Sequence, residues 1–294
     1  MEGYVIRRMK RPELDETLKR AASEGWNPGL SDAEAFWRAD EDGFFVGELT
    51  ANGAAQTAAT ISAVRYAGDG QGPDFGFVGL YIVRKELRGR GLGLRLWNEA
   101  LASLDDVPSI GLDSVLAQID TYVKDGYVLA RRSVRYEGSF GGNGHGVGEM
   151  SADLHPLAQT PFEEVLAYDR RCFPARREAF LRPWLSLPGH VALGVTRSGR
   201  LAGFGVVRPC GVGSKIGPLF ADDDAAAHSL FRGLCASAAK GPVFYDVPMN
   251  HAGAVRLAES HNMRPMFETG RLYRGPAPEY DLGREFGVTT FELG

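Results

Sequence analysis

The chain has 294 residues, of which 44% are hydrophobic and 24% are charged, so it is long enough to build two ordinary domains with hydrophobic cores. Its formal net charge is −4 and it lacks a basic tract interleaved with aromatic residues, which excludes the usual pattern of a nucleic-acid-binding protein. The sequence has no apolar run of about 18 residues and no apolar stretch typical of a secretory signal. We therefore expect a cytoplasmic protein that does not enter a membrane.

The cysteines and histidines form no metal-ligating pattern. Cys172, Cys210 and Cys235 are widely spaced in apolar surroundings and include no Cys-x-x-Cys pair, which is typical of buried, reduced thiols. His251 and His261 flank a predicted helix without an acidic or cysteine partner at ligand spacing. We predict that the function uses no metal.

Helical and strand patterns alternate along the first half of the chain. An Asn52-Gly53 pair between two alternating segments predicts a β-hairpin, because Asn-Gly tolerates the positive φ angles of a tight turn. Loops are expected at residues 67–74 and 84–90. The predicted helices are residues 12–24, 30–38, 91–104 and 118–124, and the predicted strands are residues 44–50, 57–66, 75–83, 110–115 and 127–135.

A glycine-rich stretch, residues 137–148, interrupts every periodic pattern and predicts a loop or linker. The order of the first half then partly repeats, starting with a helix and a hairpin around Ser198-Gly199. The predicted helices are residues 162–172, 223–238 and 252–260, and the predicted strands are residues 190–196, 201–208, 215–221, 243–247 and 266–273. This order predicts a tandem duplication of one α/β unit.

The junction between the predicted strand 75–83 and the helix after it carries the strongest chemical signal. It contains Arg88-Gly-Arg-Gly91-Leu-Gly93, a loop rich in glycine and arginine. Backbone N–H groups at a helix N-terminus attract anions, and glycine lets a phosphate approach without a Cβ in the way. Arg88 and Arg90 can add charge-assisted hydrogen bonds. The segment therefore predicts a binding site for a phosphate-containing ligand.

The spacing of the glycines distinguishes between phosphate-binding motifs. A P-loop needs a Gly-Lys dipeptide, which the chain lacks, so that motif is excluded. A dinucleotide fold, as in a nicotinamide- or flavin-dependent oxidoreductase, needs Gly-x-Gly-x-x-Gly directly after the strand. Here the glycines stand at positions 89, 91 and 93, and Leu94 occupies the last position. The spacing disfavours this second motif without excluding it, and a purely structural glycine turn also stays open.

Residues 83–93 closely resemble the signature of the GNAT acetyltransferases, in which a strand is followed by R/Q-x-x-G-x-G/A. The resemblance implies acetyl-CoA as co-substrate, with its pyrophosphate on the loop amides and its pantetheine arm along a strand that splays from its neighbour. It implies a twisted, mixed and mostly antiparallel sheet flanked by helices, an α/β fold. The residues that it implies in acetyl-CoA binding are Leu80, Tyr81, Ile82, Val83, Arg88, Gly89, Arg90, Gly91, Leu92, Gly93 and Leu94.

A second match lies downstream, where Gln118-x-x-x-Tyr122-x-x-x-Gly126-Tyr127 resembles a late GNAT helix and strand. The resemblance implies that Tyr122 is the general acid, since a phenol can protonate the thiolate that leaves when an amine attacks the thioester. It also implies direct transfer without an acyl-enzyme, with strand N–H groups polarising the thioester carbonyl. The alternative that Tyr122 is an ordinary core aromatic residue stays open.

Transfer to an ammonium group also needs a proton acceptor, and the strand 75–83 contains no acidic residue. Glu48, Asp74 and Asp246 are the candidates, and nothing in the sequence decides among them.

Residues 154–294 resemble the C-terminal domain of tandem GNAT proteins of the YitH type. The resemblance is carried by residues 216–222 and by the motifs Asp246-Val-Pro-x-Asn250 and Thr269-x-Arg271-x-Tyr273-x-Gly275. This half departs from the catalytic pattern twice. Aspartates occupy positions 222–224, where the arginine-glycine loop belongs and where negative charge would repel a pyrophosphate. An alanine, Ala258, stands where the first half has Tyr122.

These departures predict one active site, in a catalytic acetyl-CoA-binding domain of residues 1–137. A glycine-rich linker, residues 138–153, leads to a degenerate GNAT-like domain of residues 154–294, which is expected to supply one wall of the acceptor pocket. The candidate acceptor-binding residues are Trp26, Asn27, Asp246 and Asn250. Structural roles stay open for three of them. Trp26 as a core aromatic, Asp246 as a buried structural carboxylate and Asn250 as a helix cap are the alternatives.

The predicted function is transfer of the acetyl group of acetyl-CoA to a primary amine of a small molecule or a peptide, without nucleic acid or membrane as partner. A module that binds or senses acyl-CoA without turnover is the alternative, because the second half indicates that this scaffold can lose catalytic residues. The sequence leaves the acceptor open, and also the choice between monomer and homodimer.

Overall fold

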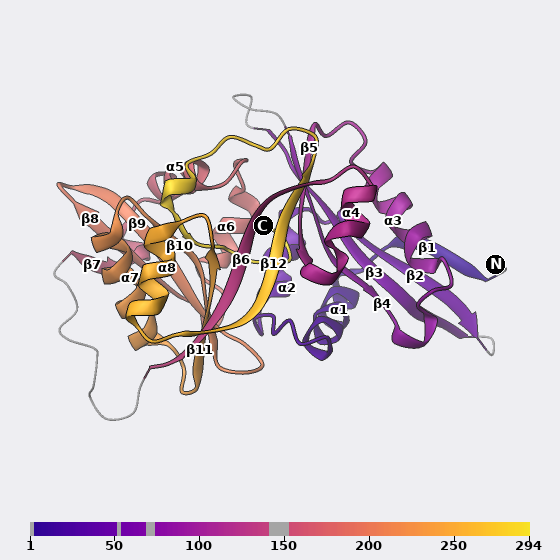
Figure 1. Ribbon diagram of the computed structural model, residues 1–294, viewed down its shortest axis with the longest axis horizontal. Helices are drawn as coiled ribbons and strands as arrows, with labels where there is room; N and C mark the ends of the chain where they lie inside the picture. The colour runs from indigo at the N-terminus through magenta and orange to yellow at the C-terminus, as the bar shows by residue number, and fades with distance from the viewer. Residues whose placement is uncertain (1–2, 52–53, 69–73, 141–152) are drawn as a thin grey trace.

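The structure is a computed structural model that describes residues 3–51, 54–68, 74–140 and 153–294. The predicted Asn52-Gly53 turn, most of the predicted loop 67–74 and most of the predicted linker 138–153 lie outside the described residues. The described strands form one continuous mixed sheet with helices packed against it (Figure 1), which confirms the predicted α/β fold.

Most predicted helices and strands are present, with ends that shift by a few residues. The helices are α1 (Arg11–Ser23), α2 (Asp32–Ala39), α3 (Leu92–Ala102), α4 (Ile119–Lys124), α5 (Phe162–Cys172), α6 (Glu178–Trp184), α7 (Asp224–Ser237) and α8 (Ala252–Ser260). The strands are β1 (Tyr4–Arg8), β2 (Phe44–Ala51), β3 (Ala54–Tyr66), β4 (Phe75–Val83), β5 (Ser109–Val115), β6 (Val128–Ser139), β7 (Leu154–Pro156), β8 (Val191–Arg197), β9 (Arg200–Pro209), β10 (Ser214–Ala221), β11 (Pro242–Pro248), β12 (Arg264–Arg274) and β13 (Glu285–Gly287).

Two kinds of difference separate the predicted elements from the observed ones. The short elements β1, β7, α6 and β13 were not predicted, because they contain too few residues to show a periodic pattern. The predicted start of the glycine-rich loop, residue 137, was wrong, since β6 continues to Ser139. In this extension Gly138 pairs with Val243 of β11, and the pairing compensates for the conformational freedom of glycine.

One strand late in each half, β6 in the first and β12 in the second, joins the sheet of the other half. The strand order is β1-β2-β3-β4-β5-β12-β6-β11-β10-β9-β8-β7, with β13 beside β10. Within it, β12 pairs with β5 of the first half, placing Leu272 opposite Leu112, and β6 pairs with β11 of the second half, placing Tyr136 opposite Tyr245. Figure 1 shows β6 and β12 side by side across the centre of the molecule. The two halves therefore form one sheet rather than two separate ones.

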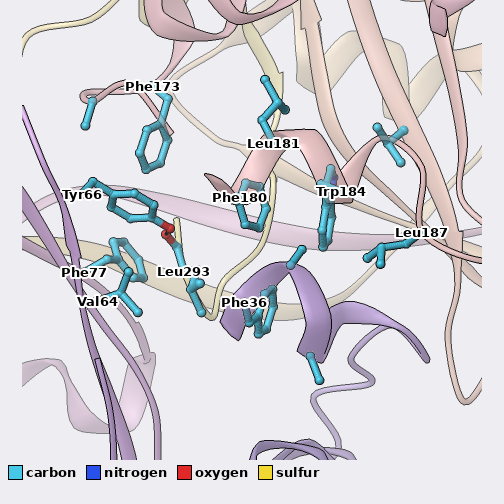
Figure 2. Packing of buried hydrophobic residues seen from close by; sticks show 14 of the residues in the cluster. Phe36, Val64, Tyr66, Phe77, Phe173, Phe180, Leu181, Trp184, Leu187 and Leu293 are labelled. Atoms are coloured by element: carbon cyan, nitrogen blue, oxygen red, sulfur yellow. Dashed lines mark hydrogen bonds between the residues drawn. The ribbon is translucent and has the colours of Figure 1, made fainter. Parts of the chain in front are cut away.

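A shared hydrophobic core also joins the halves. Alternation along β2 sends Phe44 into this core and Phe45 into a second core on the opposite face of the sheet, beneath α3. In the shared core Phe36 of α2 stacks against Phe180 and Trp184 of α6, with ring centroids 6.5 Å and 6.3 Å apart (Figure 2). Helices from both halves thus pack together on the face of the sheet that supports β4.

Candidate active site

The parallel strands β4 and β5 separate partway along their length. Their pairing runs from Phe75 opposite Ser109 to Val78 opposite Leu112, and within the described ranges it goes no further, although each strand continues for several residues. The far ends therefore leave an open wedge in which backbone groups of β4 have no strand partner on the β5 side. This is the splay that the GNAT resemblance implied.

A β-bulge distorts β4 at the start of the wedge. Two residues of β4, Leu80 and Tyr81, face the single residue Ile61 of β3. Leu80 has a φ of 49°, which is uncommon for a residue other than glycine, and the hydroxyl of Thr60 donates a hydrogen bond to its carbonyl at 3.1 Å. The bulge therefore holds the backbone of β4 in a strained, fixed orientation beside the wedge.

The N-terminus of α3 lies at the end of the loop that leaves β4. Gly89 and Gly91 have φ angles of 76° and 74°, a region that favours glycine, and Gly91 is the N-cap of the helix. No side chain caps α3, and its first turn contains no acidic residue. The first N–H groups of the helix are therefore available to an anion.

Arg88 is positioned by two contacts within this loop. Its Nε donates a hydrogen bond to the carbonyl of Val83 at 2.9 Å, and its Nη2 pairs with Glu24 at 2.9 Å. Nearly half of the side chain, 48%, is still exposed, so the guanidinium is oriented but remains accessible. Arg90 is exposed nearby. Two cations therefore flank the free helix N-terminus.

A cavity of about 650 Å³ opens between the wedge, the glycine-arginine loop and α4. Its volume is in the range of small-molecule and cofactor sites. All of the residues that the resemblance implied in acetyl-CoA binding line this cavity, and Tyr122 and Trp26 line it as well. The structure thus brings the predicted donor-site residues and the predicted general acid together.

Tyr122 reaches the cavity from the short helix α4. Its ring packs against Trp97 and Tyr127, with centroids 5.3 Å and 6.1 Å away. Burial raises the pKa of the Tyr122 phenol to about 12, so the hydroxyl keeps its proton at neutral pH. A protonated phenol on the lining of the cavity can donate a hydrogen bond.

The second half supplies a wall of the cavity, through residues that were not among the predicted ones. Phe267 and Thr269 come from β12, and Phe291 and Glu292 come from the segment after β13. Phe267 and Thr269 are two positions apart in a predicted strand, so the sequence predicted that their side chains share one face of that strand. It carried no signal that β12 joins the sheet of the first half.

Arg135 of β6 holds this wall in place. Its guanidinium binds both carboxylate oxygens of Asp246 at 2.6 Å and 2.8 Å and donates a hydrogen bond to the carbonyl of Trp26 at 2.8 Å. It lies 5.8 Å and 5.2 Å from the ring centres of Phe267 and Phe291. Burial opposes ionisation of Asp246, but Arg135 outweighs it and lowers the pKa of that carboxyl below its ordinary value.

Three of the four predicted acceptor-binding residues do not line the cavity. Asn27 exchanges two hydrogen bonds with the backbone of Val212, at 2.9 Å and 3.0 Å, and so fixes a loop contact instead. Asp246 lies behind Arg135 and is 1% exposed. Asn250 is exposed before α8, and the N-cap of that helix is His251. Only Trp26 of this set reaches the cavity within the described part of the chain.

The predicted proton acceptors are also engaged elsewhere. Glu48 binds Arg7 at 2.6 Å, and Asp74 binds Arg65 at 3.0 Å. Neither carboxylate is among the described residues that line the cavity.

The corresponding helix N-terminus of the second half, at α7, is occupied by carboxylates. Asp223 caps the helix by accepting a hydrogen bond from the N–H of Ala226 at 2.8 Å. Asp222 accepts hydrogen bonds from Tyr168 at 2.8 Å and Arg284 at 2.7 Å. These contacts leave the α7 terminus capped by a carboxylate, in contrast to the uncapped terminus of α3.

The part of the chain that the structure describes also bears on metal binding, membrane insertion and the cysteines. Within it, no three His, Cys, Asp or Glu side chains come together as a metal-binding group. Among the same residues no helix has both the length and the apolar character needed to cross a membrane. The three cysteines are free and buried.

The chain belongs to the GNAT acetyltransferase family and contains two of its domains in tandem. Residues 11–126 match the model of the acetyltransferase (GNAT) family, and residues 165–287 match that of an acetyltransferase (GNAT) domain. The fold and the cavity described above agree with this assignment. The protein is therefore an acyl-CoA-dependent N-acetyltransferase.

Individual relatives are similar over most of the chain. The holothin acyltransferase of Pseudoalteromonas sp. (strain SANK 73390) is 28% identical over 278 residues, covering 93% of this chain and 89% of the relative. The uncharacterized N-acetyltransferase YitH of Bacillus subtilis (strain 168) is 27% identical over 59% of this chain and 61% of its own length. The crystal structure of a putative acetyltransferase from Pyrococcus horikoshii has a TM-score of 0.81 at 20% identity, with 100% of this chain and 97% of that chain covered.

Proposed function

We propose that the protein transfers the acetyl group of acetyl-CoA directly to a primary amine of a small molecule or a peptide, at a single active site where the two halves meet. One observation carries the proposal. The diverged end of β4, the uncapped N-terminus of α3 and the hydroxyl-bearing ring of Tyr122 all border one cavity of about 650 Å³.

Acetyl-CoA fits the chemistry of the residues on the donor side of this cavity. The N–H groups at the start of α3, together with Arg88 and Arg90, would hold the pyrophosphate. The backbone of residues 79–83, which has no strand partner on the β5 side, would bind the amide-containing pantetheine arm by strand-like hydrogen bonds. The bulge at Leu80 supports a role for the nearby backbone N–H groups in polarising the thioester carbonyl.

Tyr122 is the group that we assign to the leaving thiolate. The amine nitrogen forms a bond to the thioester carbonyl carbon, the carbon–sulfur bond breaks, and the sulfur takes a proton from the phenol. Direct transfer is favoured over an acyl-enzyme because Cys172, Cys210 and Cys235 are buried and lie outside the described cavity lining. Burial raises the pKa of each of these thiols, which makes them poor nucleophiles.

The acceptor side favours a small molecule with apolar surface. Trp26, Phe267 and Phe291 supply aromatic faces there, and Glu292 supplies a carboxylate. The relative named holothin acyltransferase, which aligns over 93% of this chain, is by its name an acyltransferase that acts on holothin.

Calorimetric titration of the purified protein with acetyl-CoA, CoA and NADH tests the donor site without knowledge of the acceptor. We expect micromolar binding of the two CoA species and none of NADH. A panel of alkyl, arylalkyl and peptide primary amines is then screened for acetyl-CoA-dependent release of free thiol. Absence of CoA binding would overturn the donor site, and tight binding without turnover of any amine would indicate a module that senses acyl-CoA.

A further inference from the structure

Glu292 is unusual among the acidic residues that line the cavity. Besides Glu292, the described lining includes Glu24 and Asp113. Glu24 pairs with Arg88 at 2.9 Å, and Asp113 binds Arg271 through both oxygens at 2.8 Å and 2.6 Å. The side chain of Glu292 is buried, with the residue 4% exposed, and its Oε2 has no hydrogen-bond partner within the described residues. A buried carboxylate oxygen without a partner is costly, so its retention beside a cavity points to a ligand.

From this geometry we infer that Glu292 accepts a proton from the ammonium group of the acceptor, an inference that rests on the function proposed above. Its position is suitable because its backbone lies directly against the strand that binds the donor. A Cβ on Gly79 of β4 would collide with the carbonyl oxygen of Glu292. Gly79 therefore lets the C-terminal segment approach β4 immediately before the bulge, where the thioester is expected.

The segment that carries Glu292 is rigidly held. The carbonyl of Leu293 accepts a hydrogen bond from the hydroxyl of Tyr66 at 3.0 Å, and its N–H donates to the hydroxyl oxygen of Thr290 at 2.9 Å. Figure 2 shows the side chain of Leu293 beside Tyr66 and Phe77 in the core shared by both halves. The carboxylate is thus placed by the packed core, in contrast to a group on an exposed loop.

The charges around Glu292 come from several strands. Arg135 of β6 and Lys215 of β10 are the cations that interact with it electrostatically, and Asp246 of β11 lies behind Arg135. Arg135 directs its hydrogen bonds to Asp246 and Trp26. Lys215 is 1% exposed and donates to the carbonyl of Trp26 at 3.4 Å. Both cations direct their printed hydrogen bonds to other groups, so the Oε2 of Glu292 has no hydrogen-bond partner within the described residues.

The proton balance requires such an acceptor. An ammonium group transfers one proton to Glu292, and the neutral nitrogen then attacks the thioester carbonyl carbon. The carbon–sulfur bond breaks, the sulfur takes the proton of Tyr122, and the second nitrogen proton returns to the Tyr122 phenolate. The products are an amide, a free thiol and one proton, which Glu292 releases to water.

The test compares Glu292→Gln with the wild type, using acetyl-CoA and the best alkyl primary amine from the thiol-release screen. We expect kcat at pH 7 to fall about 100-fold, the effect typical of a general base, with no change in the Kd for acetyl-CoA. The deficit should shrink above about pH 10, where an alkyl amine is already neutral. A loss of kcat caused by structural damage would persist at high pH. Glu268→Gln is the matched control, since Glu268 of β12 pairs with Arg132 and is absent from the described cavity lining.

The possible outcomes separate the two proposals. A wild type that binds acetyl-CoA but acetylates no amine overturns the proposed function and Glu292 with it. An active wild type whose Glu292→Gln variant stays within about threefold of its kcat, or has the same deficit at every pH, overturns the role of Glu292 alone.

Discussion

Gly93 of α3 lies directly against Tyr81 of β4. A Cβ at position 93 would stand 2.5 Å from the hydroxyl oxygen of Tyr81 and 2.7 Å from a methyl group of Val83. The absence of a side chain at this position therefore sets how closely the N-terminus of α3 approaches the strand that lines the donor side of the cavity.

Gly93→Ala should weaken acetyl-CoA binding by pushing α3 away from β4. We expect the Kd to rise about tenfold and the protein to lose about 1–3 kcal/mol of stability, the usual cost of overpacking. Calorimetry and thermal unfolding measure the two effects. Gly211→Ala is the matched control, because a Cβ there would make only an ordinary contact of 3.5 Å with Asn27. Equal effects of both substitutions would contradict the prediction.

Arg88→Glu should raise the Kd for acetyl-CoA by about 10- to 100-fold, because it removes charge-assisted hydrogen bonds to the pyrophosphate and places two carboxylates, at positions 88 and 24, side by side. The loss should become smaller at high salt, which screens the repulsion. Lys85→Glu makes the same charge change on the same loop, outside the described cavity lining, and should have little effect. Unchanged affinity in Arg88→Glu would remove the loop from the donor site.

Tyr122→Phe should lower kcat by about 100-fold and leave the Kd for acetyl-CoA unchanged, since only the proton donor is lost. Because burial raises the pKa of Tyr122 to about 12, its deprotonation should not reduce wild-type activity below about pH 11. Steady-state kinetics across pH measures both points. Tyr127→Phe, which alters a neighbouring ring outside the described cavity lining, is the control and should keep kcat near the wild-type value.

Asp246→Asn should destabilise the protein by about 3–5 kcal/mol, because it leaves Arg135 buried without its carboxylate. The pKa of Asp246 is lowered in the folded state, so its contribution is present above about pH 4 and disappears as the pH falls through the lower folded value. Thermal unfolding between pH 7 and pH 2 should therefore show a larger loss on acidification in the wild type than in the variant. Asp74→Asn, which breaks a more exposed pair, should cost less than about 1 kcal/mol.

Local segments of the site could be predicted from the sequence because each is contiguous in the chain. The strand β4, the glycine-arginine loop and the start of α3 follow one another within residues 75–102, and their patterns depend on neighbours only a few positions away. Tyr122 was predicted from the resemblance of residues 118–127 to a late GNAT helix and strand, which is also contiguous in the chain. The free N-terminus of α3 and the capped N-terminus of α7 likewise follow from short runs of residues.

The residues that the second half contributes to the cavity were decided only by tertiary structure. Phe267 reaches the cavity because β12 pairs with β5, about 150 positions earlier in the chain, and Glu292 reaches it because the end of the chain packs against Gly79. Alternation along a strand shows which residues share a face, but it does not show which strand lies next to it. Strand exchange depends on the shape and burial of the whole core. For that reason the sequence predicted the residues of the glycine-arginine loop, while only the structure shows which residues of the second half line the cavity.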